Sequence, residues 1–168
     1  PASLALFPTR EANAAAYIWL AALAARAGGA KITPHDDPLQ ADLARLAGAN
    51  RLLRATLAEA PGFRALYADL CAATLALRPA PKLPPEEAAL EALIRAELGD
   101  DAPLSDLAQT YRKALMAGDI SAISAPYGYQ PARPVSIWLD LRDLERSGAT
   151  TVETRDADGT GEESNSDK

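Results

Sequence analysis

Apolar residues recur at spacings of three and four along most of the first 118 positions, which is the period of an α-helix. Proline, glycine and capping residues separate the segments that show this pattern. The pattern predicts six helices. Their predicted starts are at Thr9, Asp37, Asn50, Pro61, Pro85 and Ser105. Glycines mark the predicted ends, with Gly28-Gly29 as a left-handed stop, Gly48 ending the second helix, and Gly99 and Gly118 ending the last two.

Each predicted helix has one apolar face, so each needs a neighbour to cover it. The face of the fourth helix consists of Phe63, Leu66, Tyr67, Leu70, Cys71, Thr74 and Leu77. Alanine is the commonest residue, and its small side chain favours both helix formation and close packing of helices. The sequence therefore predicts an all-α fold, an Ala-rich bundle of about six helices.

The helical period is interrupted at two places and ends before the C-terminus. Residues 78–85 are rich in proline and predict an extended internal connector. From Asp119 to Pro134 the pattern fails and an irregular Pro- and aromatic-rich segment is expected, whereas Val135–Leu144 fits a short strand or a helix equally well. Residues 149–168 are polar and acidic and predict a disordered linker, which leaves residues 1–148 as the helical domain.

The formal net charge is −6. Much of it belongs to residues 149–168, which contain six acidic residues and only two basic ones, Arg155 and Lys168. The remaining chain is close to neutral and has no basic stripe, which argues against nucleic acid as a partner. Cys71 is the only cysteine, so no internal disulfide can form. No apolar run approaches the ~20 residues that a membrane helix needs. These features suggest a cytoplasmic protein without membrane insertion.

The polar residues do not form a recognisable catalytic constellation. The His35-Asp36-Asp37 cluster fits a polar turn ending in a helix cap better than a metal site, which needs three or four converging ligands. Cys71 lies on an apolar helix face, as a buried structural cysteine does. Asp119-Ile-Ser-Ala-Ile-Ser124 nearly matches the Asp-x-Ser-x-Ser metal motif, but its second serine is displaced by one residue, so a turn is expected. We therefore predict no enzyme activity, no metal and no cofactor.

Tyr17 and Trp19 are the most informative side chains of the first helix. Two residues apart on a helix, they point about 200° from each other. Either the helix is surrounded on several sides, or one of the two aromatics faces a partner. Tyr127, Tyr129 and Trp138 in the Pro-rich segment raise the same question.

The segment Leu6-Phe-Pro-Thr-Arg-Glu-Ala-Asn-Ala-Ala-Ala-Tyr-Ile-Trp-Leu-Ala-Ala resembles the Phe-Pro-x-Arg-Glu-x-Asn-x-x-x-Tyr-x-Trp-Leu-Ala-Ala stretch of the NorD-type nitric oxide reductase activation proteins. The CbbO-type Rubisco activation subunits are related to this family. The matching positions are Phe7, Pro8, Arg10, Glu11, Asn13, Tyr17, Trp19 and Leu20. The later stretch Pro131–Trp138, followed by acidic residues, is similar to the family's Pro-rich lead into a charged linker.

The resemblance implies the N-terminal helical region of such a protein, with a C-terminal von Willebrand A domain following in the full chain. A first residue of Pro1 rather than methionine also suggests a piece of a longer protein. The implied function is a non-catalytic adaptor, used in denitrification, that works with a MoxR-type AAA+ ATPase to activate a target enzyme complex. The alternative is a helical ligand-binding or enzymatic domain. The expected partner-binding residues are Arg10, Glu11, Tyr17, Trp19, Tyr127, Tyr129 and Trp138.

Overall fold

The computed structural model describes residues 5–28, 30 and 33–140, and within these ranges the fold is helical with no strand. This confirms the predicted all-α class. The five α-helices are α1 (Arg10–Ala27), α2 (Pro38–Glu59), α3 (Arg64–Leu77), α4 (Pro85–Glu97) and α5 (Asp106–Ala117). A single 3-10 turn, η1 (Pro61–Phe63), leads into α3.

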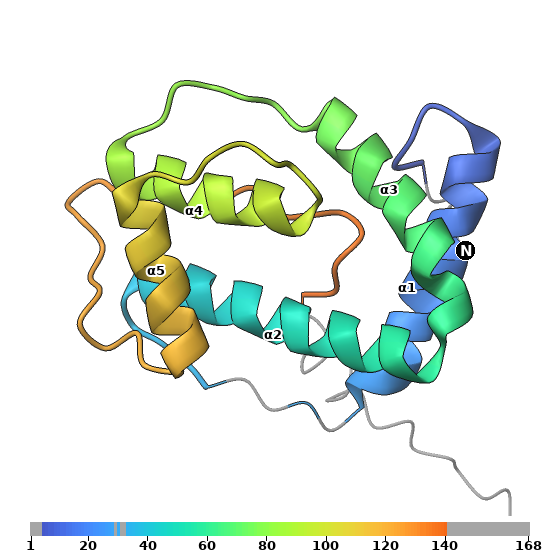
Figure 1. Cartoon of the computed structure of the whole chain (residues 1–168), viewed down its shortest axis with the longest axis horizontal. Helices are drawn as coiled ribbons and strands as arrows, with labels where there is room; N and C mark the ends of the chain where they lie inside the picture. The colour runs from blue at the N-terminus through green and yellow to red at the C-terminus, as the bar shows by residue number, and fades with distance from the viewer. Residues whose placement is uncertain (1–4, 29, 31–32, 141–168) are drawn as a thin grey trace, which may run out of the picture.

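The helices form two groups that the long helix α2 connects (Figure 1). At one end α1 packs against both α2 and α3, and η1 closes the corner between α2 and α3. At the other end α4 packs against α5, which also touches α2. The 78–84 connector carries the chain from the first group to the second as an extended stretch, as its prolines predict.

Local sequence signals set most helix ends. The side chains of Thr9, Asp37 and Ser105 each accept a hydrogen bond from a backbone N–H of the first turn that follows. Gly118 ends α5 in the left-handed conformation, with φ of 72°. Of the predicted Gly28-Gly29 stop, Gly28 is not left-handed, since its φ is −58°, and Gly29 lies outside the described residues. The Ala30 N–H donates to the Ala27 carbonyl at 3.1 Å, so the chain turns where α1 ends.

The prediction of about six helices was one too many. The two helices expected to meet at Gly48 and Asn50 are the single 22-residue helix α2. Glycine inside a helix costs only about 1 kcal/mol relative to alanine. Leu46 and Leu53, on either side of this position, are both buried, so continuing the helix keeps one unbroken apolar face and offsets that cost.

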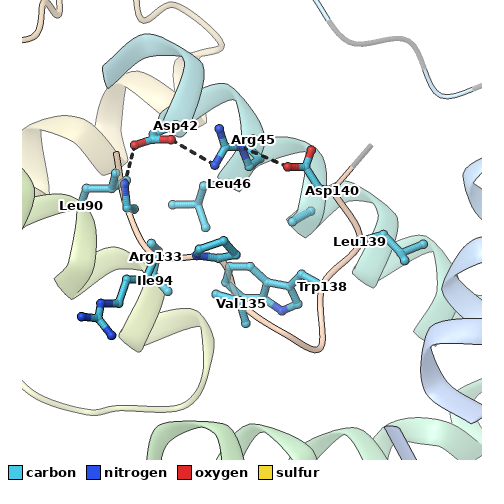
Figure 2. A pocket seen from close by; sticks show the side chains of 13 residues that line it. Asp42, Arg45, Leu46, Leu90, Ile94, Arg133, Val135, Trp138, Leu139 and Asp140 are labelled. Atoms are coloured by element: carbon cyan, nitrogen blue, oxygen red, sulfur yellow. Dashed lines mark hydrogen bonds and ion pairs between the residues drawn. The ribbon is translucent and has the colours of Figure 1, made fainter. Parts of the chain in front are cut away.

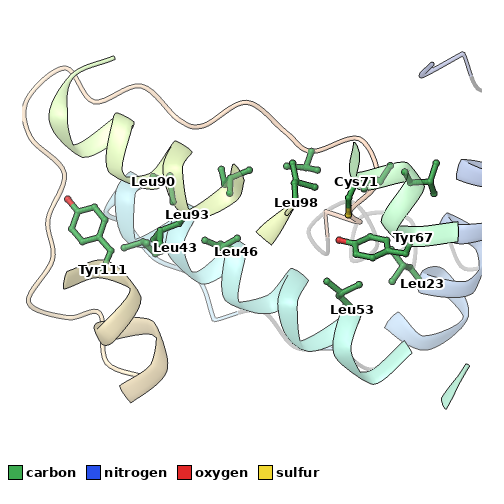
Figure 3. Packing of buried hydrophobic residues seen from close by; sticks show 14 of the residues in the cluster. Leu23, Leu43, Leu46, Leu53, Tyr67, Cys71, Leu90, Leu93, Leu98 and Tyr111 are labelled. Atoms are coloured by element: carbon green, nitrogen blue, oxygen red, sulfur yellow. The ribbon is translucent and has the colours of Figure 1, made fainter. Parts of the chain in front are cut away.

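One contiguous hydrophobic core runs through both helix groups (Figure 3). The buried face of α4 contains Leu90, Leu93 and Ile94, as the helical period predicts. On α3, Tyr67, Leu70, Cys71 and Thr74 are buried as expected, whereas the last predicted member, Leu77, is 52% exposed. The core of α3 therefore ends one turn earlier than the pattern indicates.

Residues 119–140, which we call the extended segment, wrap around the α4–α5 end and then cross the middle of the molecule (Figure 1). Tyr129, Val135 and Ile137 in this segment are buried in the common core. The described part of the stretch expected to be strand or helix, residues 135–140, is neither. It forms a turn in which the Trp138 N–H donates to the Val135 carbonyl at 3.1 Å. The expected acidic linker, residues 149–168, lies outside the described residues.

The structure explains the angular problem posed by Tyr17 and Trp19. Trp19 is completely buried, whereas Tyr17 is 66% exposed. The Trp19 ring packs 4.5 Å from the ring of Tyr67 and 6.1 Å from that of Phe63, measured between centroids. Its indole N–H donates to the carbonyl of Ile137 at 2.9 Å. One face of α1 thus binds both α3 and the extended segment, and the other faces outward.

We predict that Leu70→Ala lowers the free energy of unfolding by about 2–5 kcal/mol, the usual range for truncating a core leucine. Leu70 is 2% exposed and lies centrally on the apolar face of α3. Urea unfolding of the variant measures this loss. Leu77→Ala on the same helix is the control and should cost less than about 1 kcal/mol, because its side chain is half exposed. Equal costs at the two sites would contradict the face assignment.

A second prediction concerns the hydrogen bond of Trp19. Trp19→Phe removes the indole N–H and leaves the buried Ile137 carbonyl without this donor, which should cost about 1–3 kcal/mol. Tyr17→Phe is the matched control on the same helix and should stay within about 0.5 kcal/mol of the parent, since its ring is exposed. Denaturant unfolding followed by circular dichroism compares the two. A Trp19→Phe protein as stable as the parent would show that this bond is unimportant.

The third prediction is a pH dependence at Asp37. Burial by itself raises the pKa of this carboxyl, but hydrogen bonds from the N–H groups of Ala125, Gln40 and Leu39 outweigh it and hold the pKa below its usual value. A carboxyl with a lowered folded-state pKa stabilises the fold above the unfolded-state pKa of ~3.9, and this stabilisation is lost as the pH falls through the folded-state pKa. Asp37→Asn should therefore be less stable than the parent at pH 7.

The difference between the parent and Asp37→Asn should shrink in acid. Protonation, like the change to Asn, turns one of the two acceptor oxygens of the carboxylate into a donor group. Urea unfolding at neutral and at acid pH measures both quantities. Asp36→Asn removes an equal charge from the exposed neighbouring position and is the control. A difference that stays constant down to the lowest pH would rule out this explanation.

Candidate functional site

The seven residues expected to bind partners are divided by the structure into an exposed set and a buried set. Tyr127 and Tyr17 are exposed, as are Arg10 and Glu11 at the start of α1. Trp19 and Tyr129 are buried, and Trp138 is partly buried. The buried residues do not themselves contribute to the surface. They hold in place the backbone that presents the exposed ones.

The first anchor of the extended segment is an aromatic cluster, which joins this segment to α1 and α3. Tyr67 of α3 stacks at a tilt on Trp19 and accepts a hydrogen bond on its hydroxyl from the indole N–H of Trp138, at 2.9 Å. The two tryptophans of the chain, 119 positions apart in sequence, are thus connected through one tyrosine. Burial is the main cause that raises the pKa of the Tyr67 hydroxyl, so this group stays neutral at physiological pH.

Asp42 on α2 is the second anchor of the extended segment (Figure 2). One carboxylate oxygen accepts hydrogen bonds from the Tyr129 hydroxyl at 2.7 Å and from the Ala132 N–H at 2.9 Å. The other oxygen lies 3.2 Å from Nη1 of Arg45, and Nε of Arg45 lies 4.0 Å from the Asp140 carboxylate. Asp42 is 4% exposed, and the donors and the cation around it compensate for the burial of its charge. Burial, and next the hydrogen bond to Asp42, raise the pKa of Tyr129.

Arg78, at the end of α3, is the third anchor. Its guanidinium binds Glu91 of α4 through two hydrogen bonds of 2.7 and 2.8 Å, a bidentate geometry. The same group also donates to the carbonyls of Arg133 and Pro134, at 2.9 and 3.3 Å. The Arg78 side chain is only 5% exposed. It therefore ties α3, α4 and the extended segment together at a single point.

Just before the residues that the second and third anchors hold, the extended segment makes a tight turn with Tyr127 at its tip. The Tyr129 N–H donates to the Pro126 carbonyl at 3.1 Å, and Gly128 has φ of 79°. Since no non-glycine residue among the described ones has a positive φ, this is a type II turn, which favours glycine at its third position. Nearby, the Gln130 N–H donates to Glu87 of α4 at 2.9 Å. Tyr127, with a relative exposure of 108%, is thus fully exposed on a turn whose backbone is held by hydrogen bonds.

The second exposed surface is the outer side of α1. Tyr17 and Ile18 are exposed there to 66% and 50%. Arg10 and Glu11 occupy the amino end of the same helix. In Figure 1 this helix and the α4–α5 end lie at opposite ends of the molecule, so Tyr17 and Tyr127 belong to two separate surfaces.

Two hollows lie beside α2. A small cavity of about 60 Å³ separates the apolar side of α2 from α4 and the extended segment, next to Asp42 and Arg45 (Figure 2). A larger groove of about 490 Å³ runs along the other side of α2, between the loop before this helix and the end of α5. Small residues of α2 form part of its wall, among them Ala41, Ala44 and Gly48. His35, Arg45, Arg51 and Asp140 also line it.

The residues considered as catalytic candidates have roles in the fold: one caps a helix, one is buried in the core and one forms a turn. Asp37 of the His35-Asp36-Asp37 cluster caps α2, as expected of a polar turn. Cys71 is buried, and burial raises the pKa of its thiol, the reverse of what an activated thiolate needs. The Asp119 carboxylate accepts hydrogen bonds from the N–H and the hydroxyl of Ser121, as in a turn. Within the part of the chain that the structure describes, no group of three or more metal-ligating side chains occurs.

Sequence analysis missed the residues that position this site. Nothing in the sequence singles out Asp42 and Arg78, because each lies in or beside an ordinary helical segment. Tyr67 was expected on a buried helix face, but not as the acceptor of the Trp138 N–H. Asp42 offers the one usable signal, since a charged residue stands beside Leu43 on a face that the leucine spacing buries. A buried acid needs donors, but the sequence does not say which ones.

The chain is similar in sequence to proteins named Protein NorD. It is 35% identical over 154 residues to Protein NorD of Brucella abortus, an alignment that covers 91% of this chain and 23% of the relative. The same values hold for Protein NorD of Brucella melitensis. Protein NorD of Stutzerimonas stutzeri is 33% identical over 140 residues, which are 83% of this chain and 18% of that protein.

The chain thus spans less than a quarter of the length of the curated relatives it matches. No family model matches it, and no solved structure matches it. None of the helices in the described ranges is both long and apolar enough to cross a membrane. The alignment extends over nine-tenths of the chain, far more than the short stretch at the start of α1 on which the sequence resemblance rests. The chain therefore belongs to the NorD family, as a homologue of the N-terminal region of these proteins.

Proposed function

We propose that this chain is a non-catalytic adaptor module of a NorD-type activation protein. In this role it binds a partner while a MoxR-type AAA+ ATPase supplies the work that activates or matures a target enzyme, a nitric oxide reductase or a similar complex. The assembly would work in the cytoplasm, with a von Willebrand A domain in the same protein. The family membership supports the activation role, and the partners are those that the NorD resemblance implies.

The single observation that carries the adaptor role is the presentation of Tyr127. Exposed aromatics that are rigid before binding are typical anchors of protein interfaces, because little conformational entropy remains to be lost. On the C-terminal side of the turn, Asp42 accepts from the Tyr129 hydroxyl and Glu87 accepts from the Gln130 N–H. On the N-terminal side, Asp37 accepts from the Ala125 N–H at 2.8 Å. Three carboxylates on two helices thus brace the turn that carries one exposed ring.

The other exposed residues of the expected set form the second part of the proposal. Tyr17, Arg10 and Glu11 lie on the outer side of α1, far from the Tyr127 turn. An adaptor that connects two proteins needs two separate surfaces, and the structure offers an exposed aromatic at each end. Trp19, Tyr129 and Trp138 support these surfaces from the core. The surroundings of Cys71, Asp37 and Asp119 give none of them the arrangement of a nucleophile or a general base.

One observation favours the alternative of a ligand-binding domain. The groove beside α2 has the size of a small-molecule site, and His35, Arg45 and Arg51 line it. Arg45, however, is directed at Asp42 and Asp140 rather than left available for a ligand. The adaptor role remains the better supported of the two functions.

The test of the proposed function is Tyr127→Ala. The change removes an exposed ring from a braced turn, so the melting temperature should stay within about 1–2 °C of the parent. Binding to the purified MoxR-type ATPase or to nitric oxide reductase, measured by biolayer interferometry, should weaken at least about tenfold, the effect of losing an interface anchor. Tyr127→Phe keeps the ring and is the matched control.

Met116→Ala removes a second exposed apolar side chain, 83% exposed on α5, and controls for unspecific stickiness. It should leave binding to both proteins unchanged. If Tyr127→Ala binds both proteins as tightly as the parent, the turn is not the anchor and the proposal loses its main support.

A further inference from the structure

The larger groove beside α2 has the dimensions of a short helix. On the side of α2 its lining extends from Ala41 to Arg51, which is about 15 Å at a rise of about 1.5 Å per residue. The lining between these two residues is mostly of small side chains, so another stretch of backbone can come close to α2. Opposite this floor stand Leu115, Ile120 and Leu139, which are only partly buried by the described residues.

The described part of the chain ends at this groove. Leu139 and Asp140 are the last two residues described, and both line it. Nε of Arg45 lies 4.0 Å from the Asp140 carboxylate, so this end of the extended segment is held beside α2. Consecutive Cα atoms are about 3.8 Å apart. The residue after Asp140 therefore starts beside the groove, in whichever direction the chain continues.

Residues 141–148 have the sequence pattern of a short helix with one apolar face. They read Leu-Arg-Asp-Leu-Glu-Arg-Ser-Gly. Leu141 and Leu144 are three residues apart and so share a face, whereas the residues between and after them are polar. Asp140 suits the N-cap position, and Leu139 and Leu144 then have the spacing of a hydrophobic staple. Gly148 suits the end of such a helix.

A helix of two turns is not stable by itself in water, because one or two hydrogen bonds do not offset the cost of nucleation. It needs a surface that covers its leucines, and the groove is the surface at which it starts. Residues 141–147 in helical form measure about 10 Å, which is shorter than the groove. Its small floor leaves room for leucine side chains.

We propose that residues 141–147 form a short helix that lies in the groove beside α2, with Leu141 and Leu144 packed on the small residues of α2. The groove is then a packing contact within the domain rather than a ligand site. The proposal rests on the groove and on the sequence that follows it, and it does not depend on the activation role.

Thiol labelling of the full chain tests whether the groove is covered. Ala44→Cys places a thiol on its floor. This thiol should react slowly with DTNB in the otherwise unchanged chain. It should react at least about tenfold faster when Leu141→Asp and Leu144→Asp are added, because the charged side chains cannot stay in the groove and local protection is lost. Arg142→Ala with Arg146→Ala changes the other side of the same segment, and this matched control should leave the rate unchanged.

Two further thiols calibrate the measurement. Cys71 is buried and reacts only if the whole domain opens, so it should stay unreactive in every folded variant. Met116→Cys, on the exposed side of α5, gives the rate of an uncovered thiol. Equal rates for Ala44→Cys with and without the two leucine changes would overturn the proposal. Protection that disappears on dilution would show that a second copy of the chain covers the groove, which would also overturn it.

Discussion

The hydrogen bond from the buried indole of Trp19 to the carbonyl of Ile137 is the constraint on which the rest of this structure depends. A buried N–H without a partner costs about 1–3 kcal/mol, so a tryptophan placed at the centre of a helical core needs an acceptor. The carbonyls of the neighbouring helices are already used within those helices. A segment without regular structure has free carbonyls, and here it is drawn into the core to supply one. The first helix and the last described turn of the chain are thereby joined.

The same principle recurs along the extended segment. Its backbone groups cannot bond within a helix or a sheet, so they are satisfied by side chains from the helices it crosses. Asp42 binds the Ala132 N–H, Arg78 binds the carbonyls of Arg133 and Pro134, and Glu87 binds the Gln130 N–H. Asp42 and Arg78, which are both buried, are in turn paired with Arg45 and Glu91. The segment and the helices therefore specify each other's positions.

This arrangement separates the supporting residues from the surfaces they present. Among the apolar side chains that stay exposed are the Tyr127 ring and, on the outer face of α1, Tyr17 and Ile18. They lie at opposite ends of the molecule and are supported by different anchors, Asp42 and Glu87 for the one and the Trp19–Tyr67 contact for the other. For a chain that matches less than a quarter of its relatives' length, surfaces of this kind are the natural points of contact with other proteins.

The sequence by itself determined the features that depend on neighbouring residues. Thr9, Asp37 and Ser105 cap helices wherever the chain goes next, and Gly118 ends α5 because it can adopt a positive φ. The helical period also identified the buried faces of α3 and α4, and it separated Tyr17 from Trp19 by angle. It did not say which of the two side chains faces inward, because the angle between them is the same whichever of them points toward the core.

Tertiary structure decided whatever depends on partners far away in the sequence. Gly48 stays inside α2 because the leucines on both sides of it bury against other helices, a gain that no local rule contains. Val135–Asp140 becomes a turn rather than a strand or a helix because Trp19 and Tyr67 offer it hydrogen bonds from 118 and 71 positions away. Asp42 is a core residue only because Tyr129 and Ala132 reach it. These contacts need the assembled core, and so only the folded chain could show them.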